Sequence, residues 1–469
     1  MQQHGGRGAA RWLVVAVGSL VVAGSVALAL VVARLPFLAP WMPSPQFFKR
    51  ALVVHVDLSI LVWFYAFLAA LFSMLPARSA VPRRGAAGPG IAVAGITLMI
   101  ATALVPDVQP VLCNYVPALD HGAFLVGLAA FFGGVAWTLL DERLLPWREP
   151  PAPGGLVPDA AVPGLRTAAL AFLLALLTVG GAASSLPAGL PAQGRFELLF
   201  WGGGHVLQIA SVAAMLSVWL MLLTPALGRS PLPRRVAAAL FGLLLLPALA
   251  APVLALQGVQ RGEVHEAFTQ FMRWGIFPVV LAFLAACLQA LLRAVRAGQV
   301  RMRDPRVLGF CASAALTVVG FLLGALIRGS TTMVPAHYHA SIGAVTAGFM
   351  TITWPMLRAL GAPVPSGRLQ RLSVVQPLWF GAGQLVFALG FALAGAEGMA
   401  RKAYGAEQHV RTALEWTGLV VMGAGGLVAI TGGVLFLALF TLTVFRRRAA
   451  STFQPGSSPW VVVNIPSSH

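Results

Sequence analysis

The chain has 469 residues, of which 58% are hydrophobic and only 10% are charged. This balance is typical of a protein that crosses a membrane several times, and it excludes an ordinary soluble enzyme. The formal net charge of +18 does not indicate a nucleic-acid-binding protein, because the arginines fall in short clusters between apolar segments. The 3 cysteines form no CxxC or CxxCH motif, so we expect no c-type haem attachment and no thiolate copper site.

Twelve apolar stretches follow one another along the chain and are long enough, or nearly so, to cross about 30 Å of hydrocarbon. In chain order they are Trp12–Ala33, Leu52–Leu75, Ile91–Val105, Ala123–Leu140, Thr167–Ala183, Leu198–Leu223, Val236–Leu256, Phe268–Leu292, Val307–Ile327, Thr332–Leu357, Val374–Ala394 and Leu414–Val444. The third is short. We therefore expect an all-α polytopic membrane protein, with one twelve-helix bundle over residues 1–448 and a cytoplasmic tail over residues 449–469.

The distribution of basic residues sets the expected orientation, since cytoplasmic loops of membrane proteins are enriched in Lys and Arg. With the N-terminus in the cytoplasm, most of the 32 basic residues lie on the inner side. They include Arg234, Arg235 and Arg446–Arg448. Both termini are then cytoplasmic, and we expect a multi-pass protein of the bacterial inner membrane.

Five histidines from four separate stretches fall at one membrane depth. His55 is near the start of the second helix, His205 is about two turns into the sixth, and His265 is in the outer connection before the eighth. His337 and His339 open the tenth helix. Ionisable residues inside a membrane are costly and usually functional, and imidazole is the common ligand for haem iron and copper. The pattern predicts a haem or multi-metal site, and the alternative is a set of polar residues that line a water-filled path.

His337 and His339 are the centre of this pattern because they stand two residues apart on one expected helix. Successive helical residues turn by about 100°, so the two imidazoles point about 200° apart. They therefore leave opposite flanks of the helix. Each ring has the direction needed to reach a different metal centre.

Four local motifs carry a family resemblance. They are FWGGGH at Phe200–His205, HEAFT at His265–Thr269, AHYHASIGAV at Ala336–Val345 and GMARKAY at Gly398–Tyr404. In this order, on twelve expected helices, they resemble subunit I of the haem-copper oxidase superfamily. That superfamily includes cytochrome c oxidases and bacterial nitric oxide reductases.

The resemblance implies two haems and a second metal. It implies that His55 and His339 are the axial ligands of a low-spin haem and that His337 is the one protein ligand of a high-spin haem. It implies that His205 and His265, with Glu266 where the family has a second histidine, hold copper or a non-haem iron. A carboxylate ligand shifts the preference of such a site from copper toward iron. The alternative for Glu266 is a loop residue that faces water and binds nothing.

The other two members of the implied site are basic. Arg401 and Lys402 of the GMARKAY segment match the paired basic residues that hold haem propionates in the family. Propionates are carboxylates at the membrane surface, and carboxylates bind cationic partners strongly.

The chain departs from the oxidase pattern at positions that serve O–O cleavage and proton uptake. Ile209 stands where oxidases of the main branch have a tyrosine and nitric oxide reductases a glutamate, and Leu207 stands where many oxidases have an acid. Asp57 is the clear intramembrane acid below the haem level. None of the four tyrosines is expected on the sixth or seventh helix; they are Tyr65, Tyr115, Tyr338 and Tyr404.

The function that the resemblance implies is that of the haem-binding catalytic-type subunit of a membrane terminal oxidase, reducing O2. Two alternatives stay open, a nitric oxide reductase-like enzyme and a non-catalytic haem protein that relays electrons or senses a gas. A transporter with histidines along a proton path is a further alternative, but we find no repeat symmetry between the halves. Because the chain has no haem c motif and no copper-thiolate domain, electrons must come from a partner subunit, a soluble cytochrome or quinol. Membrane lipid and a small gas complete the expected partners, and nucleic acid is not among them.

Overall fold

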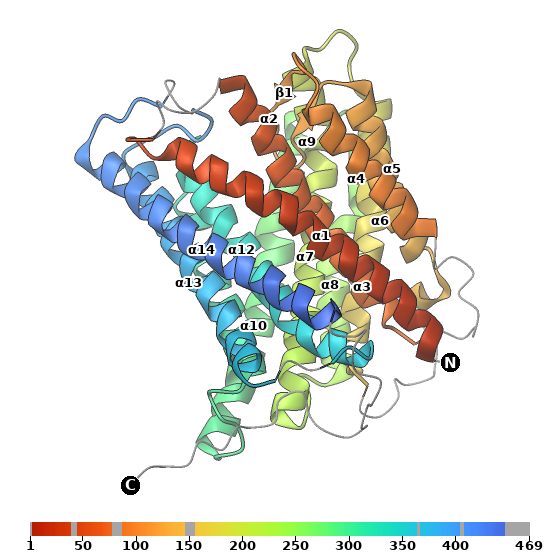
Figure 1. Ribbon diagram of the computed structural model, residues 1–469. Helices are drawn as coiled ribbons and strands as arrows, with labels where there is room; N and C mark the ends of the chain where they lie inside the picture. The colour runs from red at the N-terminus through yellow and green to blue at the C-terminus, as the bar shows by residue number, and fades with distance from the viewer. Residues whose placement is uncertain are drawn as a thin grey trace.

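The computed structural model is built almost entirely of α-helices (Figure 1). It describes residues 2–38, 45–76, 87–145, 155–363, 366–403 and 408–445. The predicted tail over residues 449–469 and Tyr404 of the GMARKAY segment lie outside the described residues.

Within these described ranges there are fourteen α-helices, with short π- and 3-10 helical segments between some of them. They are α1 (Gln2–Arg34), α2 (Pro45–Val56), the π-helical η2 (Asp57–Val62), α3 (Trp63–Ser73), α4 (Ala87–Ala103), α5 (Gly122–Leu139), the 3-10 helix η3 (Glu142–Leu144), α6 (Val162–Ser184), α7 (Ala192–Leu227), α8 (Arg234–Leu256), α9 (Gly262–Gln270), the π-helical η4 (Phe271–Ile276), α10 (Phe277–Arg296), α11 (Pro305–Ala325), α12 (Met333–Ala359), α13 (Arg368–Ala396) and α14 (Ala413–Phe445). Two short strands, β1 (Pro110–Val111) and β2 (Ala118–Leu119), pair antiparallel.

Among the described residues, eleven helices are long and apolar enough to cross a membrane, and α4 is a twelfth, shorter apolar helix. Each of the twelve matches one predicted stretch, so the predicted polytopic helical bundle is confirmed. Two spans are composite, since α2, η2 and α3 form one continuous span and α9, η4 and α10 form another. Several spans begin earlier than predicted, because polar residues at a helix end continue the backbone hydrogen bonds beyond the apolar core.

The spans α7 and α12, which carry three of the predicted site histidines, are the most buried of the eleven. α7 packs against α6, α10 and α12, and α12 packs between α11 and α13. By contrast, α1, α8 and α14 bury much smaller fractions of their surface. The predicted site therefore lies on the central helices of the bundle.

Small residues let some of these helices approach closely, as the glycine runs indicate. A Cβ on Gly425 of α14 would lie 2.2 Å from the backbone nitrogen of Phe387 on α13. A Cβ on Gly390 of α13 would lie 2.2 Å from the backbone nitrogen of Met422 on α14. Only glycine is compatible with such contacts, so α13 and α14 are held at backbone contact.

The ends of the helices that bear the histidines lie together at one end of the bundle. In Figure 1 the β1 strand, α2 and α9 lie at the same, upper end. Hydrogen bonds tie the end of α1 to the loop after α13, because Arg34 Nη2 donates to the Arg401 carbonyl at 2.9 Å. Arg401 Nη2 in turn donates to Asn114 Oδ1, in the loop between β1 and β2, at 3.0 Å.

Candidate functional site

The two histidines of α12 point to opposite flanks, as the helical period predicts. His337 faces α11, where its Nδ1 lies 2.6 Å from the carbonyl oxygen of Gly320. His339 faces α13, and its ring lies 4.6 Å from the ring of Phe387 and 6.0 Å from that of Phe391. One helix thus separates two histidine environments.

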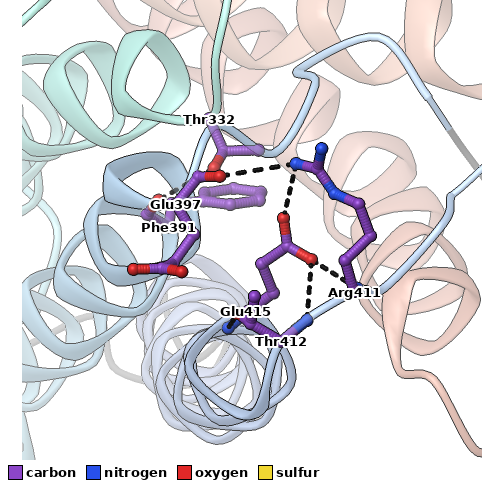
Figure 2. Close-up of polar contacts among 6 residues, drawn as sticks. All are labelled: Thr332, Phe391, Glu397, Arg411, Thr412 and Glu415. Carbon is purple, nitrogen blue, oxygen red and sulfur yellow. Dashed lines mark hydrogen bonds and ion pairs between the residues drawn. The ribbon is translucent and has the colours of Figure 1, made fainter.

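The start of α12 is fixed by contacts with its neighbours, and this positions both histidines (Figure 2). Thr332, the residue before α12, donates from its hydroxyl to the Phe391 carbonyl of α13 at 3.0 Å. Its backbone nitrogen donates to the Met399 carbonyl at 2.8 Å. Figure 2 also shows Arg411, which precedes α14, reaching the carbonyl of Glu397 at the end of α13. The start of α12, the end of α13 and the start of α14 are therefore joined.

His55, on α2, lies on the side of α12 to which His339 points. Its Nδ1 is 3.0 Å from the carbonyl oxygen of Ala23 on α1. His55 and Arg34 are both near enough to His339 to interact with it electrostatically. The guanidinium of Arg34 also lies 5.1 Å from the ring centroid of Phe391, which contacts His339. The fold therefore brings the two histidines predicted as a low-spin pair into one neighbourhood.

The hydrogen bonds of His55 and His337 determine which ring nitrogen is available to a ligand. A carbonyl oxygen only accepts, so Nδ1 of each ring carries the proton and Nε2 keeps its lone pair. Histidines that bind metals almost always make this hydrogen bond, because it fixes the tautomer and the ring orientation. Both residues fit the role of an axial haem ligand on this observation.

The residues predicted to hold a second metal lie on α7 and α9. His205 and His265 both lie beside Trp201, with ring-centroid distances to it of 4.9 Å and 5.0 Å, and they are near enough to each other to interact electrostatically. His265 is within α9 and not in the connection before it, since the polar start of this span is helical. Glu266 is exposed and accepts a hydrogen bond from Gln270 one helical turn later. Within the described part of the chain, no group of three His, Cys, Asp or Glu side chains is placed to hold a metal.

Tyr115 contacts His205, although it was not predicted as a site residue. Its hydroxyl lies 2.9 Å from His205 Nε2, and its ring centroid lies 4.5 Å from that of the histidine. The family resemblance implies a tyrosine only on the sixth or seventh helix, whereas Tyr115 is in the loop between β1 and β2. The signal available in the sequence was a tyrosine beside Asn114 in an outer connection.

The surroundings of Tyr115 keep its phenol protonated. Burial, and then the negative charge of Glu197, raise the pKa of Tyr115, while Arg401 acts in the opposite direction. The hydroxyl therefore donates its proton to His205 Nε2. The other nitrogen of His205, Nδ1, lies 2.7 Å from the Trp201 carbonyl and donates to it.

The predicted propionate partners lie beside the same loop. Arg401 Nε donates to Ser330 Oγ at 3.1 Å, in addition to its bond with Asn114. Burial, and then the neighbouring charge of Arg401, lower the pKa of Lys402, and Glu197 acts in the opposite direction. These two cations and Glu197 form a charged cluster at the end of the bundle that carries the histidines.

The departures from the oxidase pattern have clear structural positions. Ile209 and Leu207 are buried on α7, and the Leu207 carbonyl accepts the hydroxyl of Tyr65 at 2.9 Å. Asp57 is fully buried at the start of η2, and its carboxylate oxygens have no hydrogen-bond partner among the described residues. π-Helical segments inside α-helices are frequent at functional sites.

Comparison with known sequences places the chain beside proteins without an assigned function. No protein-family model matches it. An uncharacterized protein of Aquifex aeolicus is 30% identical over 361 residues, which cover 77% of this chain and 87% of the relative. An uncharacterized protein of Rickettsia prowazekii is 25% identical over an alignment of 509 positions, which covers 95% of this chain and 97% of the relative.

Comparison with solved structures identifies the fold. A cryo-EM structure of a heme-copper terminal oxidase dimer superposes with a TM-score of 0.69, covering 96% of this chain and 85% of that chain. The sequence identity is 16%, so this likeness concerns the fold. The chain therefore has the polytopic helical architecture of a terminal oxidase subunit.

Proposed function

We propose that this chain, which belongs to the same family as the uncharacterized Aquifex aeolicus protein, is a haem-binding oxidoreductase of the terminal oxidase type. The observation that carries the proposal is the pair His337 and His339 on opposite flanks of α12, with His55 beside the second of them. The fold shared with a heme-copper terminal oxidase supports it. We place the protein in the bacterial inner membrane with both termini in the cytoplasm.

In this proposal each histidine has one role. His55 and His339 hold a low-spin haem, and His337 holds a high-spin haem. Bound haem supplies one-electron redox chemistry and, where the protein gives only one axial ligand, a free coordination position for a small gas. The carbonyls of Ala23 and Gly320 accept the Nδ1 protons of His55 and His337 and so orient Nε2 for ligation. Metal ligands need such second partners to fix their orientation.

The charged cluster at the same end serves haem carboxylates. Arg401 and Lys402 are the cations, and the bonds of Arg401 to Ser330 and Asn114 hold its guanidinium in place. Charge-assisted hydrogen bonds of this kind are about twice as strong as neutral ones. The indole N–H of Trp201 is buried and has no partner among the described residues, so the pocket also offers a donor to a bound acceptor.

The substrate in this proposal is O2, with NO as the alternative. Electrons come from a partner subunit, a soluble cytochrome or quinol at the outer side, because the chain has no motif for a c-type haem or a copper-thiolate centre. A second candidate function is a haem protein that relays electrons or senses a gas without turnover. The hydrogen bonds on both nitrogens of His205 favour this second candidate, because they occupy a residue that the oxidase reaction needs as a metal ligand.

The haem content and spectrum of the purified protein test the proposal. We expect about two haems per chain by the pyridine haemochrome assay. His339→Ala should abolish the low-spin spectrum and keep CO binding, because it removes one ligand of the six-coordinate iron. His337→Ala should abolish CO binding and keep the low-spin spectrum.

A matched control is His121→Ala, which removes an exposed histidine that caps the start of α5 by accepting from the Ala123 backbone nitrogen at 3.2 Å. This variant should leave both haem signals unchanged. Colourless wild-type protein would exclude the proposal, and a low-spin signal that survives both His55→Ala and His339→Ala would exclude these two ligands.

A further inference from the structure

We infer that this chain has no second-metal site, because the hydroxyl of Tyr115 occupies the nitrogen of His205 that such a metal would use. A Tyr115–His205 hydrogen-bonded pair takes the place of the metal. The inference rests on the haem-binding part of the proposed function, and it favours the second candidate, a haem protein that relays electrons or senses a gas, over O2 reduction. It also explains why the expected set of His205, His265 and Glu266 does not form a cluster.

The first step concerns the two nitrogens of His205. A neutral imidazole has one N–H donor and one lone pair. The Nδ1 proton is donated to the Trp201 carbonyl at 2.7 Å, and Nε2 accepts the Tyr115 proton at 2.9 Å. Neither nitrogen is left to bind a metal. A metal ion would have to break the Tyr115 bond and leave the buried hydroxyl with only the weak sulfur acceptor Met272 Sδ, 3.9 Å away.

The second step concerns the other two expected ligands. His265 donates its Nε2 proton to the Val259 carbonyl at 2.8 Å, so only Nδ1 of this ring has a lone pair. The exposed carboxylate of Glu266 is hydrogen-bonded to Gln270. One available imidazole nitrogen is not a metal site, since such sites in proteins take about three or four protein ligands.

The third step concerns the loop between β1 and β2, whose contacts hold Tyr115 beside His205. Its backbone φ is +67°, in the left-handed region that residues other than glycine seldom adopt. Asn114, before it, donates from both its backbone and side-chain nitrogens to Glu197 at the start of α7. Cys113 donates its Sγ proton to the Val116 carbonyl at 2.8 Å. The loop is therefore held on both sides of the tyrosine.

The helix that carries His205 also has a position shaped for Tyr115. A Cβ on Gly204 would lie 2.3 Å from the Cβ of Tyr115, so only glycine allows the tyrosine to rest on α7 here. Beside the pair, the buried indole N–H of Trp201 has no acceptor among the described residues. A metal cation cannot accept a hydrogen bond. The indole N–H of Trp201 can thus be satisfied by a hydrogen-bond acceptor and not by a cation.

Metal analysis of the purified wild-type protein tests the inference. Total iron and copper are measured by mass spectrometry and compared with haem from the pyridine haemochrome assay, which reports the proposed function separately. We expect iron and haem in equal amounts and no stoichiometric copper. Copper(I) added in competition with a chromophoric chelator should find no site that depends on His205.

Tyr115→Phe tests whether the Tyr115 hydroxyl prevents metal binding at His205, because it removes the hydroxyl and frees His205 Nε2. We expect this variant to bind copper(I) at least tenfold more tightly than wild type and His205→Ala to remove the gain. Tyr65→Phe is the matched control, since it removes another buried hydroxyl bonded to α7, at Leu207, without contacting His205. It should bind copper(I) as wild type does.

One equivalent of copper or non-haem iron in the wild-type protein, lost in His205→Ala, would overturn the inference. A Tyr115→Phe variant that gains no copper affinity would overturn the role of Tyr115 in closing the site. Because metal and haem are counted separately, protein without haem would reject the proposed function while the metal count still decides this inference.

Discussion

The histidines of this chain divide by what their ring nitrogens contact. In His55 and His337 one nitrogen donates to a backbone carbonyl, and the other keeps its lone pair. In His205 both nitrogens are hydrogen-bonded, one of them to Tyr115. All three are the same residue type, and the sequence predicts the same membrane depth for them. The difference lies in the partners, and it separates residues that fit haem ligation from one that does not.

The contact between Gly204 and Tyr115 predicts that Gly204→Ala is destabilising. Gly204→Ala places a methyl group 2.3 Å from Tyr115 Cβ, so the loop between β1 and β2 must move away from α7. Overpacking of this kind costs about 1–3 kcal/mol. We expect a lower thermal unfolding temperature in detergent and, through the lost Tyr115 bond, copper(I) binding like that of Tyr115→Phe.

The control for this variant is Gly242→Ala on α8, where an added Cβ meets no atom within 4 Å. Alanine stabilises an open helical position by about 1 kcal/mol relative to glycine, so this variant should unfold at the same or a higher temperature. Equal unfolding temperatures for the two variants would show that Tyr115 does not rest on Gly204.

At the scale of elements, the start of α14 is closed by a reciprocal pair of hydrogen bonds (Figure 2). The backbone nitrogen of Glu415 donates to Thr412 Oγ1 at 3.1 Å, and the backbone nitrogen of Thr412 donates to Glu415 Oε2 at 3.3 Å. This is a capping box, in which the residue before the helix and the third helical residue satisfy each other's backbone donors. Arg411 adds a bond from its guanidinium to Glu415 Oε1 at 2.9 Å.

Thr412→Ala is predicted to destabilise this end of the bundle. Loss of such a cap costs about 1 kcal/mol, so we expect a small fall in the unfolding temperature and faster amide exchange in the first turn of α14. Thr417→Ala is the control, because its exposed hydroxyl bonds the Ala413 carbonyl inside the same helix. Equal exchange rates in the two variants would contradict a role for the capping box.

At the scale of the whole molecule, the described residues offer few groups for moving protons across the bundle. On α7, Leu207 and Ile209 stand where the family resemblance predicts proton or electron donors, and both are buried and apolar. Asp57 is buried with no hydrogen-bond partner among the described residues, so no hydrogen bond from these residues continues a proton path at its carboxylate. Proton pumps need chains of titratable groups.

We therefore expect any turnover to move no protons beyond those that the chemistry consumes. The measurement is the external pH of vesicles that contain the purified protein and receive electrons from a donor that releases a known number of protons. External acidification clearly above the donor's own release would refute this expectation, and the same vesicles with an uncoupler provide the control.

The helical architecture of this protein can be predicted from its amino-acid sequence. Hydropathy located twelve membrane-spanning helices, because an apolar run of about twenty residues has no other stable place than the bilayer. The helical period also predicted that His337 and His339 leave opposite flanks, and the structure confirms it. Hydropathy and helical period are both properties of a single helix, so they can be predicted without knowledge of the tertiary structure.

Only the tertiary structure decided what the site contains. Tyr115 and His205 are 90 residues apart in the chain. No pattern in either segment predicts that the loop between β1 and β2 packs against α7. The exposed position of Glu266 depends on the rotation of α9 about its axis. Hydropathy does not predict this rotation, because the first residues of α9 are polar. The haem ligands remain predictions. The physical reason is that hydropathy and period act within one element, whereas a binding site is made where several elements meet.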